Sequence, residues 1–204
     1  LRRLGVQVWT STSVVDIDAE GATVRPRDAD DVERIAAHTV LWAAGVKTSE
    51  LAQHLHGSTP LERDRQGRLV VGTDLSLPGY PEVFVIGDLA NCTTESGTPL
   101  PALAPVATQQ GSYVGKVIRH RLAGKPTSPF RYRDYGMMAT IGRKLAVARI
   151  GGWDVSGYVA WLLWLLVHLM KIVHHENRVL VLVQWAWNYL TWNRSARLIT
   201  KDPQ

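Results

Sequence analysis

The stretch Val83–Ala90, VFVIGDLA, decides the fold class. Its unbroken run of Val, Phe and Ile is typical of a parallel strand buried on both faces, and the run closes on Gly87 and Asp88. Ligands of doubly wound α/β sheets lie beyond the carboxyl ends of the strands, where a carboxylate accepts hydrogen bonds from hydroxyl groups and glycine lets a ligand approach the backbone. An Asp at a strand end also commonly caps the following turn. The stretch predicts an α/β fold and leaves both roles open for Asp88.

The residues before this stretch indicate further strands. Apolar and β-branched runs predict short strands at Val6–Trp9, Val14–Asp18, Ala22–Arg25 and Thr39–Trp42, with a turn at Gly21. The run Val40–Val46, VLWAAGV, is typical of a buried strand that turns abruptly at its glycine. Arg63–Val71, RDRQGRLVV, has the pattern of a second hairpin.

A helix is predicted after the stretch. Over Ala104–Leu122 the spacing becomes helical and places four side chains on one face: Val106, Gln110, Val114 and Val117. Pro105 suits the first turn, where its missing N–H costs nothing, and Gly124-Lys125-Pro126 ends the helix. Met137–Ile150 is then expected to form two strands joined at Gly142-Arg143-Lys144.

Charge and cysteine content narrow the class of protein. The chain has 23 Lys and Arg against 18 Asp and Glu, and the acidic residues concentrate before position 95. A basic second half indicates either a solvated surface or an anionic partner, namely nucleic acid or a membrane. The single cysteine, Cys92, excludes an internal disulfide and favours a reducing compartment. The chain opens LRRLGVQVW without an initiator Met or a signal peptide, so we expect a fragment.

Tryptophan gathers near the end of the chain. Six of the eight tryptophans lie between Trp153 and Trp192, within or beside the apolar runs Tyr158–Met170 and Val179–Trp192. A run of about 13 residues covers only about 20 Å, less than the 30 Å of a bilayer core. On a helical wheel, aromatic and basic side chains form one narrow stripe: Trp161, Trp164, His168, Lys171 and His175. The pattern predicts amphipathic helices rather than membrane spans.

These helices favour attachment in the plane of a membrane. Tryptophan and flanking cations suit the membrane interface, which makes the following residues candidates for lipid contact: Trp161, Trp164, Lys171, Trp185, Trp192, Arg194 and Arg197. A buried helical hairpin, a dimer interface, a partner-binding surface and a two-span hairpin are the alternatives. The interleaved Leu and Val side chains favour lipid over nucleic acid. His174-His175-Glu176 predicts no metal site, because adjacent His side chains diverge on a helix.

Several motifs occur in an order that resembles a known family. VLWAAGV, VFVIGDLA, APVATQQG, YRDYGMMATIGRKLAV, WLLWLLVHLM and LVQWAWNYLTWNRSARLIT follow one another as in the C-terminal half of a type II NADH dehydrogenase, the non-proton-pumping NADH:quinone oxidoreductase. That family has two Rossmann-type units, for FAD and NADH, followed by a membrane-binding segment. Neither G-x-G-x-x-G phosphate fingerprint is present here. The resemblance implies three parts: residues 1–78, the tail of the NADH unit; 79–125, the returning FAD unit; and 126–204, a β-hairpin with amphipathic membrane-anchoring helices.

The resemblance also implies cofactor contacts. Gly87 and Asp88 correspond to the motif that holds the ribityl chain of FAD, and Ala44 and Gly45 lie in the turn near the nicotinamide–flavin contact. The start of the helix, Ala104, Pro105 and Val106, would present backbone N–H groups to the flavin ring. Small residues at 43–45 are equally expected in any tight turn of a close-packed core.

Quinone contacts are implied at the same helix and at the following strand. The family pattern is A-Q-x-A-x-Q, and this chain departs from it with Pro105 in place of the first Gln, which removes a quinone-contacting amide. Pro105 then borders the quinone, with Thr108, Gln109 and Gln110 as neighbouring candidates. A solvated helix face is the alternative for the two Gln residues. Gly136 and Ala139 correspond to the strand beside the quinone channel, or line a plain core.

The sequence therefore predicts part of an FAD-dependent NADH:quinone oxidoreductase that passes two electrons from NADH through FAD to a membrane quinone. The cofactor carries the chemistry, so no side chain is assigned as catalytic and no metal is expected. The implied partners are a quinone, a lipid surface on the cytoplasmic face of a membrane and a possible second subunit. The alternatives are a non-enzymatic membrane-binding or dimerisation module and a related reductase with a soluble acceptor. The 204 residues alone are expected to be inactive.

Overall fold

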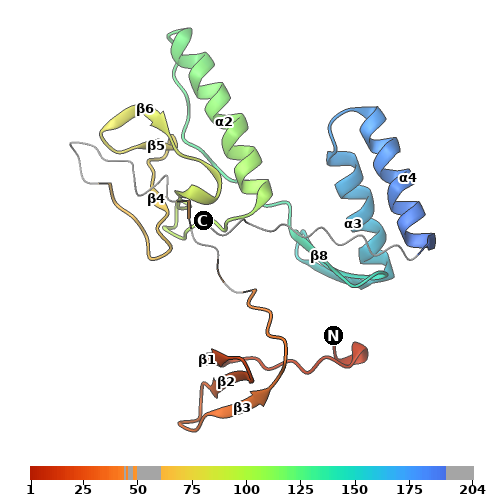
Figure 1. Ribbon diagram of the computed structural model, residues 1–204. Coiled ribbons are helices and arrows are strands. Elements are labelled where there is room, and N and C mark those ends of the chain that lie inside the picture. Colours follow the sequence, from red (N-terminus) through yellow and green to blue (C-terminus); the bar gives the residue numbers. More distant parts are fainter. Residues whose placement is uncertain (44, 46–47, 50–60, 192–204) are drawn as a thin grey trace, which may run out of the picture. The chain divides into compact units, whose positions relative to one another are not determined.

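The computed structural model describes residues 1–43, 45, 48–49 and 61–191. The chain divides into two compact units, Leu1–Asp134 and Tyr135–Gln204, and each is described by itself. Figure 1 shows the elements of both units. The three-part division at residues 78 and 125 stays a prediction.

The first unit begins with a short 3₁₀-helix, η1 (Arg2–Leu4), and an antiparallel sheet of three strands. The strands β1 (Thr12–Asp18), β2 (Gly21–Pro26) and β3 (Glu33–Ala36) follow in chain order. The register pairs Val14 with Val24 and Ile17 with Ala22, so these four apolar side chains lie on one face of the sheet. The predicted strands at 14–18 and 22–25 are confirmed, while the turn predicted at Gly21 lies at residues 19–20 and Gly21 begins β2.

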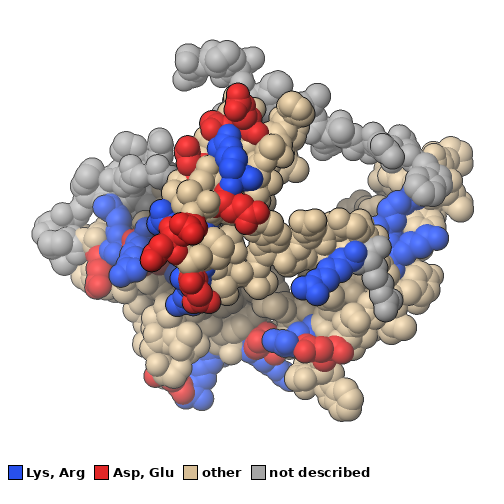
Figure 2. Space-filling model, turned by 90° about the horizontal axis from the view of Figure 1, so that it is seen from below, with Lys and Arg blue, Asp and Glu red and all other residues tan. Residues whose placement is uncertain are grey.

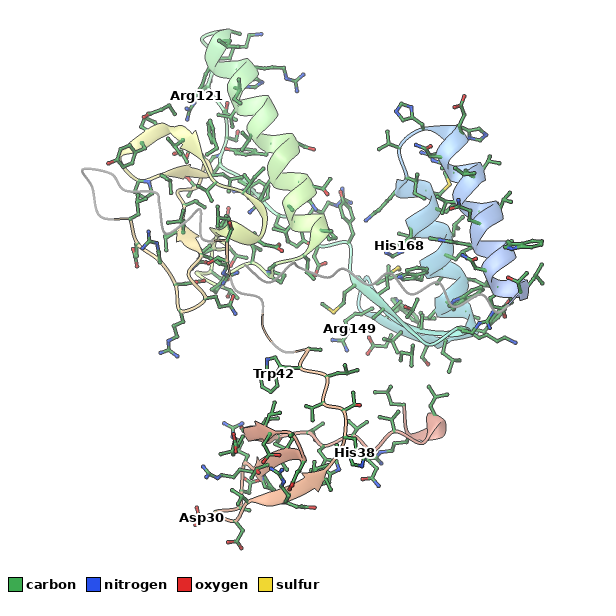
Figure 3. All side chains as sticks on the ribbon, viewed as in Figure 1. Asp30, His38, Trp42, Arg121, Arg149 and His168 are labelled. Carbon is green, nitrogen blue, oxygen red and sulfur yellow. The ribbon has the colours of Figure 1, made fainter. Side chains whose placement is uncertain are left out.

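Two other predicted strands in this region are wrong. Residues 6–9 and 39–42 have irregular backbone, and Leu41 and Trp42 are 88% and 62% exposed. An apolar run becomes a strand only where a neighbour satisfies its backbone groups, and no other described segment pairs with these two. Figure 3 shows Trp42 on the extended chain that leaves β3.

The rest of the first unit is built from short strands and one long helix. The elements are β4 (Leu69–Val70), β5 (Ser76–Leu77), β6 (Tyr80–Phe84), the 3₁₀-helix η2 (Gly87–Leu89), β7 (Ala90–Asn91) and α2 (Ala104–Leu122). β4 and β7 pair in parallel, whereas β5 and β6 are antiparallel. Their core includes Leu69, Leu77, Val85 and Ala90, and a second apolar cluster, with Leu75 and Val106, packs beside it.

The prediction of a buried parallel strand at Val83–Ile86 is therefore wrong in its pairing. β6 ends at Phe84 and forms a hairpin with β5, with Leu77 opposite Tyr80 across Pro78-Gly79. Val85 is buried, but Ile86 is 38% exposed. The parallel pair lies next along the chain, where β7 follows the Gly-Asp motif directly.

Helix α2 has the predicted bounds and the predicted buried face. Val106, Gln110 and Val117 are 4%, 1% and 2% exposed. At its C-terminal end, Arg121 binds the Asp74 carboxylate at 3.0 Å, donates to the Pro81 carbonyl and lies over the Phe84 ring. Figure 3 shows Arg121 at that end of the helix. The helix is thereby fixed to the β5–β6 hairpin.

A return segment, residues 126–133, runs back along α2 and is held by its backbone. His120 Nδ1 lies 2.8 Å from the Pro126 carbonyl, and the Tyr113 hydroxyl donates to the Ser128 carbonyl at 2.9 Å. The Gln109 amide donates to the Arg133 carbonyl at 2.9 Å and accepts from the Arg133 N–H at 3.0 Å. Three side chains of one helix therefore fix the path that leads to the second unit.

The second unit is an antiparallel sheet with two helices. Its strands β8 (Met137–Ile141), β9 (Leu145–Ile150) and β10 (Trp153–Gly157) lie in the order β10-β9-β8. The two strands predicted over 137–150 are confirmed, and β10 was not predicted. Arg149 joins β9 to β10 through two bonds to the Asp154 carboxylate, at 2.6 and 2.9 Å; Figure 3 labels Arg149. Figure 2 shows such adjoining basic and acidic side chains at several places on one face.

Helices α3 (Tyr158–Lys171) and α4 (His175–Thr191) form a hairpin, as Figure 1 shows. The Trp164 and Trp185 rings stack across it at 5.7 Å, and Trp161 lies 5.8 Å from the Tyr189 ring. Ala160 and Trp164 also pack on Ala146 and Ala148 of the sheet. Within the described residues, neither this pair nor α2 offers a helix with the length and apolarity that a bilayer crossing needs.

Candidate functional site

The Gly-Asp motif forms a tight turn between β6 and β7. Gly87 has a φ of +68°, a left-handed conformation that favours glycine, and a Cβ there would contact the Ala107 side chain at 3.6 Å. Val85 before the turn and Ala90 after it are both buried in the core. Because the core holds both ends of the turn, the exposed Asp88 is carried on a rigid support.

Asp88 lines a cleft of about 370 Å³. The cleft is lined by Thr48, Ser49, Gln66, Arg68, Ile86, Asp88, Leu89 and Ala102. The Asp88 carboxylate, the Arg68 guanidinium and two hydroxyl groups thus line the same cleft, together with apolar side chains. This set of groups suits a ligand that carries both hydroxyls and negative charge.

Arg68 is held firmly in the wall of this cleft. Its Nε donates to the Asp64 carboxylate at 2.6 Å and its Nη1 donates to the Leu100 carbonyl at 3.2 Å, with 12% of the side chain exposed. Burial acts to raise the pKa of Asp64, but the Arg68 side chain and the N–H groups of Arg68 and Gln66 hold that pKa below its ordinary value. The turn at residues 64–68, which carries both side chains, was predicted only as part of the Arg63–Val71 hairpin. The Asp-x-x-Gly-Arg order is the signal that could have identified Arg68.

The start of α2 lies near the Gly87-Asp88 turn. Pro105 is in the first turn, as predicted, and Leu103 precedes the helix without a side-chain cap. The N–H groups of Val106 and Ala107 both donate to the Leu103 carbonyl, at 2.9 and 3.1 Å. These two N–H groups are thus engaged within the first turn, and the Val106 side chain is buried in the core. The flavin contacts assigned to Ala104, Pro105 and Val106 stay predictions.

The two glutamines have defined structural roles. Gln109 grips the Arg133 backbone through both ends of its amide, and Gln110 is buried with its Oε1 accepting from the Gly87 N–H at 2.7 Å. Neither matches the solvated helix face given above as the alternative. The exposed Thr108 hydroxyl donates to the Ala104 carbonyl at 2.8 Å. Quinone contact by these residues stays a prediction.

The other cofactor and quinone candidates are placed only in part. Ala44 lies outside the described residues, and Gly45 has a φ of +80°. Gly136 and Ala139 belong to the second unit, at the start of β8 and within it. A Cβ on Gly136 would lie 2.0 Å from the Arg149 carbonyl oxygen, so the close strand pairing by itself requires glycine there.

The predicted aromatic-and-basic stripe is wrong in its extent. It does not reach His175, because α3 ends at Lys171 and the chain turns before α4, with a φ of +69° at His174. Trp161, Trp164 and Trp185 are half-buried and face the interior of the helical hairpin. The exposed large side chains that do not line the space between the helices are mainly aliphatic: Val159, Leu166, Met170, Val179, Leu180, Val183 and Trp187. They form the outward surface of the hairpin.

Lys171 is exposed at the end of α3, whereas Trp192, Arg194 and Arg197 lie outside the described residues. Between α3 and α4 lies an apolar cavity of about 450 Å³, lined by indole, phenol and leucine side chains of both helices, including Trp161, Trp164, Trp185, Tyr189 and Leu190. Lipid contact by the candidate residues stays a prediction. Within the part of the chain that is described, no three potential metal ligands gather.

Comparison with known proteins defines the class. The family model described as pyridine nucleotide-disulphide oxidoreductase matches residues 1–111, and the chain belongs to that family. Its mixed α/β fold agrees with the prediction, while the membrane-binding role of the C-terminal helices is not shown.

Within the family, the chain is similar to type II NADH:quinone oxidoreductases, which confirms the resemblance inferred from its motifs. It is 39% identical to the Mycobacterium tuberculosis enzyme Ndh over 98% of this chain and 42% of the relative, and 36% identical to NdhA of the same organism over 99% and 43%. It is 33% identical to the demethylphylloquinone reductase NdbB of Synechocystis, over 89% and 43%. The chain thus spans less than half the length of these relatives.

A solved structure shows the same fold. NDH2 from Plasmodium falciparum, solved in complex with NADH, superposes with a TM-score of 0.77 at 14% identity and covers 92% of this chain and 52% of the parasite protein. At this identity the likeness concerns the fold alone.

Proposed function

We propose that the protein to which this chain contributes oxidises NADH and passes two electrons through FAD to a quinone at a membrane surface, without pumping protons. The observation that carries the proposal is the cleft at Asp88, which lies in the family-matched region and is lined by both an exposed carboxylate and a fixed guanidinium. The relatives named NADH:quinone oxidoreductase supply the donor and acceptor.

The residues of the cleft fit FAD. Asp88 is exposed and free to accept hydrogen bonds from ribityl hydroxyls, Gly87 lets the chain approach the backbone, and the Arg68 guanidinium suits an anionic group. When bound, FAD supplies the two-electron chemistry that the side chains lack. The protein's own contribution is to bind and orient, which agrees with assigning no catalytic side chain.

The helical hairpin is proposed to lie in the cytoplasmic surface of a membrane. Its outward surface exposes Leu166, Val183 and Trp187 by 55%, 59% and 64%, which is a costly arrangement in water and a favourable one in lipid. The apolar cavity between α3 and α4 offers room for part of an isoprenoid tail. The helices therefore link lipid to quinone delivery.

The deciding experiment compares the complete gene product with the 204-residue chain for bound flavin and for NADH:quinone turnover. Bound FAD and turnover in the complete product alone are expected. A complete product that lacks both would overturn the proposal and favour a non-enzymatic membrane-binding or dimerisation module. Turnover with soluble acceptors alone would favour the related soluble-acceptor reductase.

A further inference from the structure

The buried face of α2 contains one polar side chain among apolar ones. Gln110 is 1% exposed and lies between Val106 and Val117, which are also buried. Transfer of an amide into an apolar interior is unfavourable unless its hydrogen bonds are replaced. The position of Gln110 is therefore explained only by the groups that it binds.

Those groups are at both ends of the turn that carries Asp88. The Gln110 Oε1 accepts from the Gly87 N–H at 2.7 Å, and the Gln110 side chain also lies beside the Cys92 thiol. Cys92 is buried and its sulfur lies 3.8 Å from the Thr93 carbonyl. One side chain of α2 thus spans the segment from Gly87 to Cys92, with Asp88 between its two contacts.

We propose that Gln110 is a positioning residue for the cofactor cleft: it fixes the Gly87–Cys92 segment so that Asp88 faces the ligand in one orientation. Glycine loses more conformational freedom on ordering than any other residue, and Gly87 is held at a φ that other residues rarely adopt. The hydrogen bond from Gly87 N–H to the buried amide restricts that freedom before the ligand arrives. Gln110 itself is too buried to touch the cofactor.

The inference rests on the proposed function for the identity of the ligand, FAD. Gln110→Met keeps a similar length and volume but removes the hydrogen bond to Gly87 and the amide beside Cys92. Gln110→Glu is the conservative variant, since a protonated carboxyl in this site still accepts from the Gly87 N–H. Val117→Ala is the matched control, on the same buried face of α2, because it loosens the packing without touching the Gly87 turn. Asp88→Ala tests the ligand assignment itself.

The complete protein is stripped of flavin and titrated with FAD, and amide hydrogen exchange is followed across residues 85–92. Gln110→Met is expected to weaken FAD binding about tenfold and to speed exchange at Gly87 about as much, the size expected when one buried N–H loses its partner. Gln110→Glu should restore most of both effects. Val117→Ala should lower the melting temperature yet leave FAD affinity within about twofold, because its effect is confined to packing.

The outcomes separate the two proposals. Unchanged FAD affinity in Gln110→Met, with weakened affinity in Asp88→Ala, overturns the positioning role alone. Unchanged affinity in both variants overturns the FAD assignment and the positioning role with it. Equal weakening by Gln110→Met and Val117→Ala shows general loosening and overturns the role. If Gln110→Met does not fold, amide exchange in the unaltered protein decides. Slower exchange at Gly87 than at Asp88 supports the positioning role, and equal or faster exchange at Gly87 overturns it.

Discussion

Replacing Arg68 with Met removes a guanidinium that joins the 64–68 turn to the segment before α2. The Arg68 and Asp64 side chains are 12% and 17% exposed, and Nε lies 2.6 Å from the carboxylate. Removal of one partner of a fully buried pair costs about 3–5 kcal/mol, whereas exposed pairs contribute up to about 1 kcal/mol. For this mostly buried pair we expect a loss of about 2 kcal/mol, which includes the bond to the Leu100 carbonyl.

The free energy of unfolding is measured by urea denaturation of the complete protein, with fluorescence and far-UV circular dichroism as separate probes. Glu95→Gln is the matched control, since it breaks an ion pair with Arg131 in which both side chains are 78% exposed, and no measurable loss is expected. Adding Asp64→Asn to Arg68→Met should recover part of the loss, because no unpaired carboxylate then remains. A loss as small as that of the control would refute this account of the cleft wall.

The same pair predicts a pH dependence. The pKa of Asp64 is lower in the folded state than its ordinary value of 3.8, so the unfolded chain binds more protons in acid. Its stabilising contribution should be complete above that value and be lost as the pH falls through the folded pKa. In the Arg68→Met variant, the free energy of unfolding should fall less steeply as the pH is lowered through this range. Asp88→Ala should lower the FAD content of the purified protein, whereas Glu82→Ala, which removes an exposed carboxylate of β6, should not. Equal FAD stoichiometry in the unaltered protein and both variants would end the ribityl assignment. Removal of residues from 157 onward should preserve reduction of a water-soluble acceptor and impair reduction of a long-tailed quinone, and equal survival of both activities would contradict the membrane-entry role. Trp187→Ala should weaken vesicle flotation without a change in stability, because Trp187 is 64% exposed. Trp164→Ala should mainly lower the stability, because its ring stacks on Trp185 between the helices. Loss of stability in Trp187→Ala and loss of flotation alone in Trp164→Ala would contradict the orientation of the hairpin.

Helix α2 could be predicted from the sequence because each local signal agreed. Pro105 marks its first turn, the apolar spacing marks its buried face and Gly124 follows its end. The spacing places Gln110 on the face of Val106 and Val117, but a solvated position stays open for it. The sequence could not show that its amide meets the Gly87 N–H, since the two residues come together only through packing.

Strand pairing and the outward face of the helices were harder to predict. An apolar run carries no information about its partner, and the Pro78-Gly79 turn that makes β6 antiparallel was given no weight. The helical wheel assumed one continuous helix past Lys171, so it joined side chains that the turn at His174 separates. Arg68 was missed because its role depends on Asp64, Leu100 and the cleft together.

The return segment beside α2 is held mainly through its main chain, and this determines which sequence changes it tolerates. His120, Tyr113 and Gln109 all grip main-chain atoms of residues 126–133, so these contacts do not depend on which side chains the segment carries. Within the segment, the side chains of Phe130 and Tyr132 pack against the apolar core, and Arg131 pairs with Glu95. The hydrogen bonds to the main chain therefore tolerate substitution within the segment, whereas inserting or deleting a single residue would displace every such bond beyond it and shift where the second unit begins.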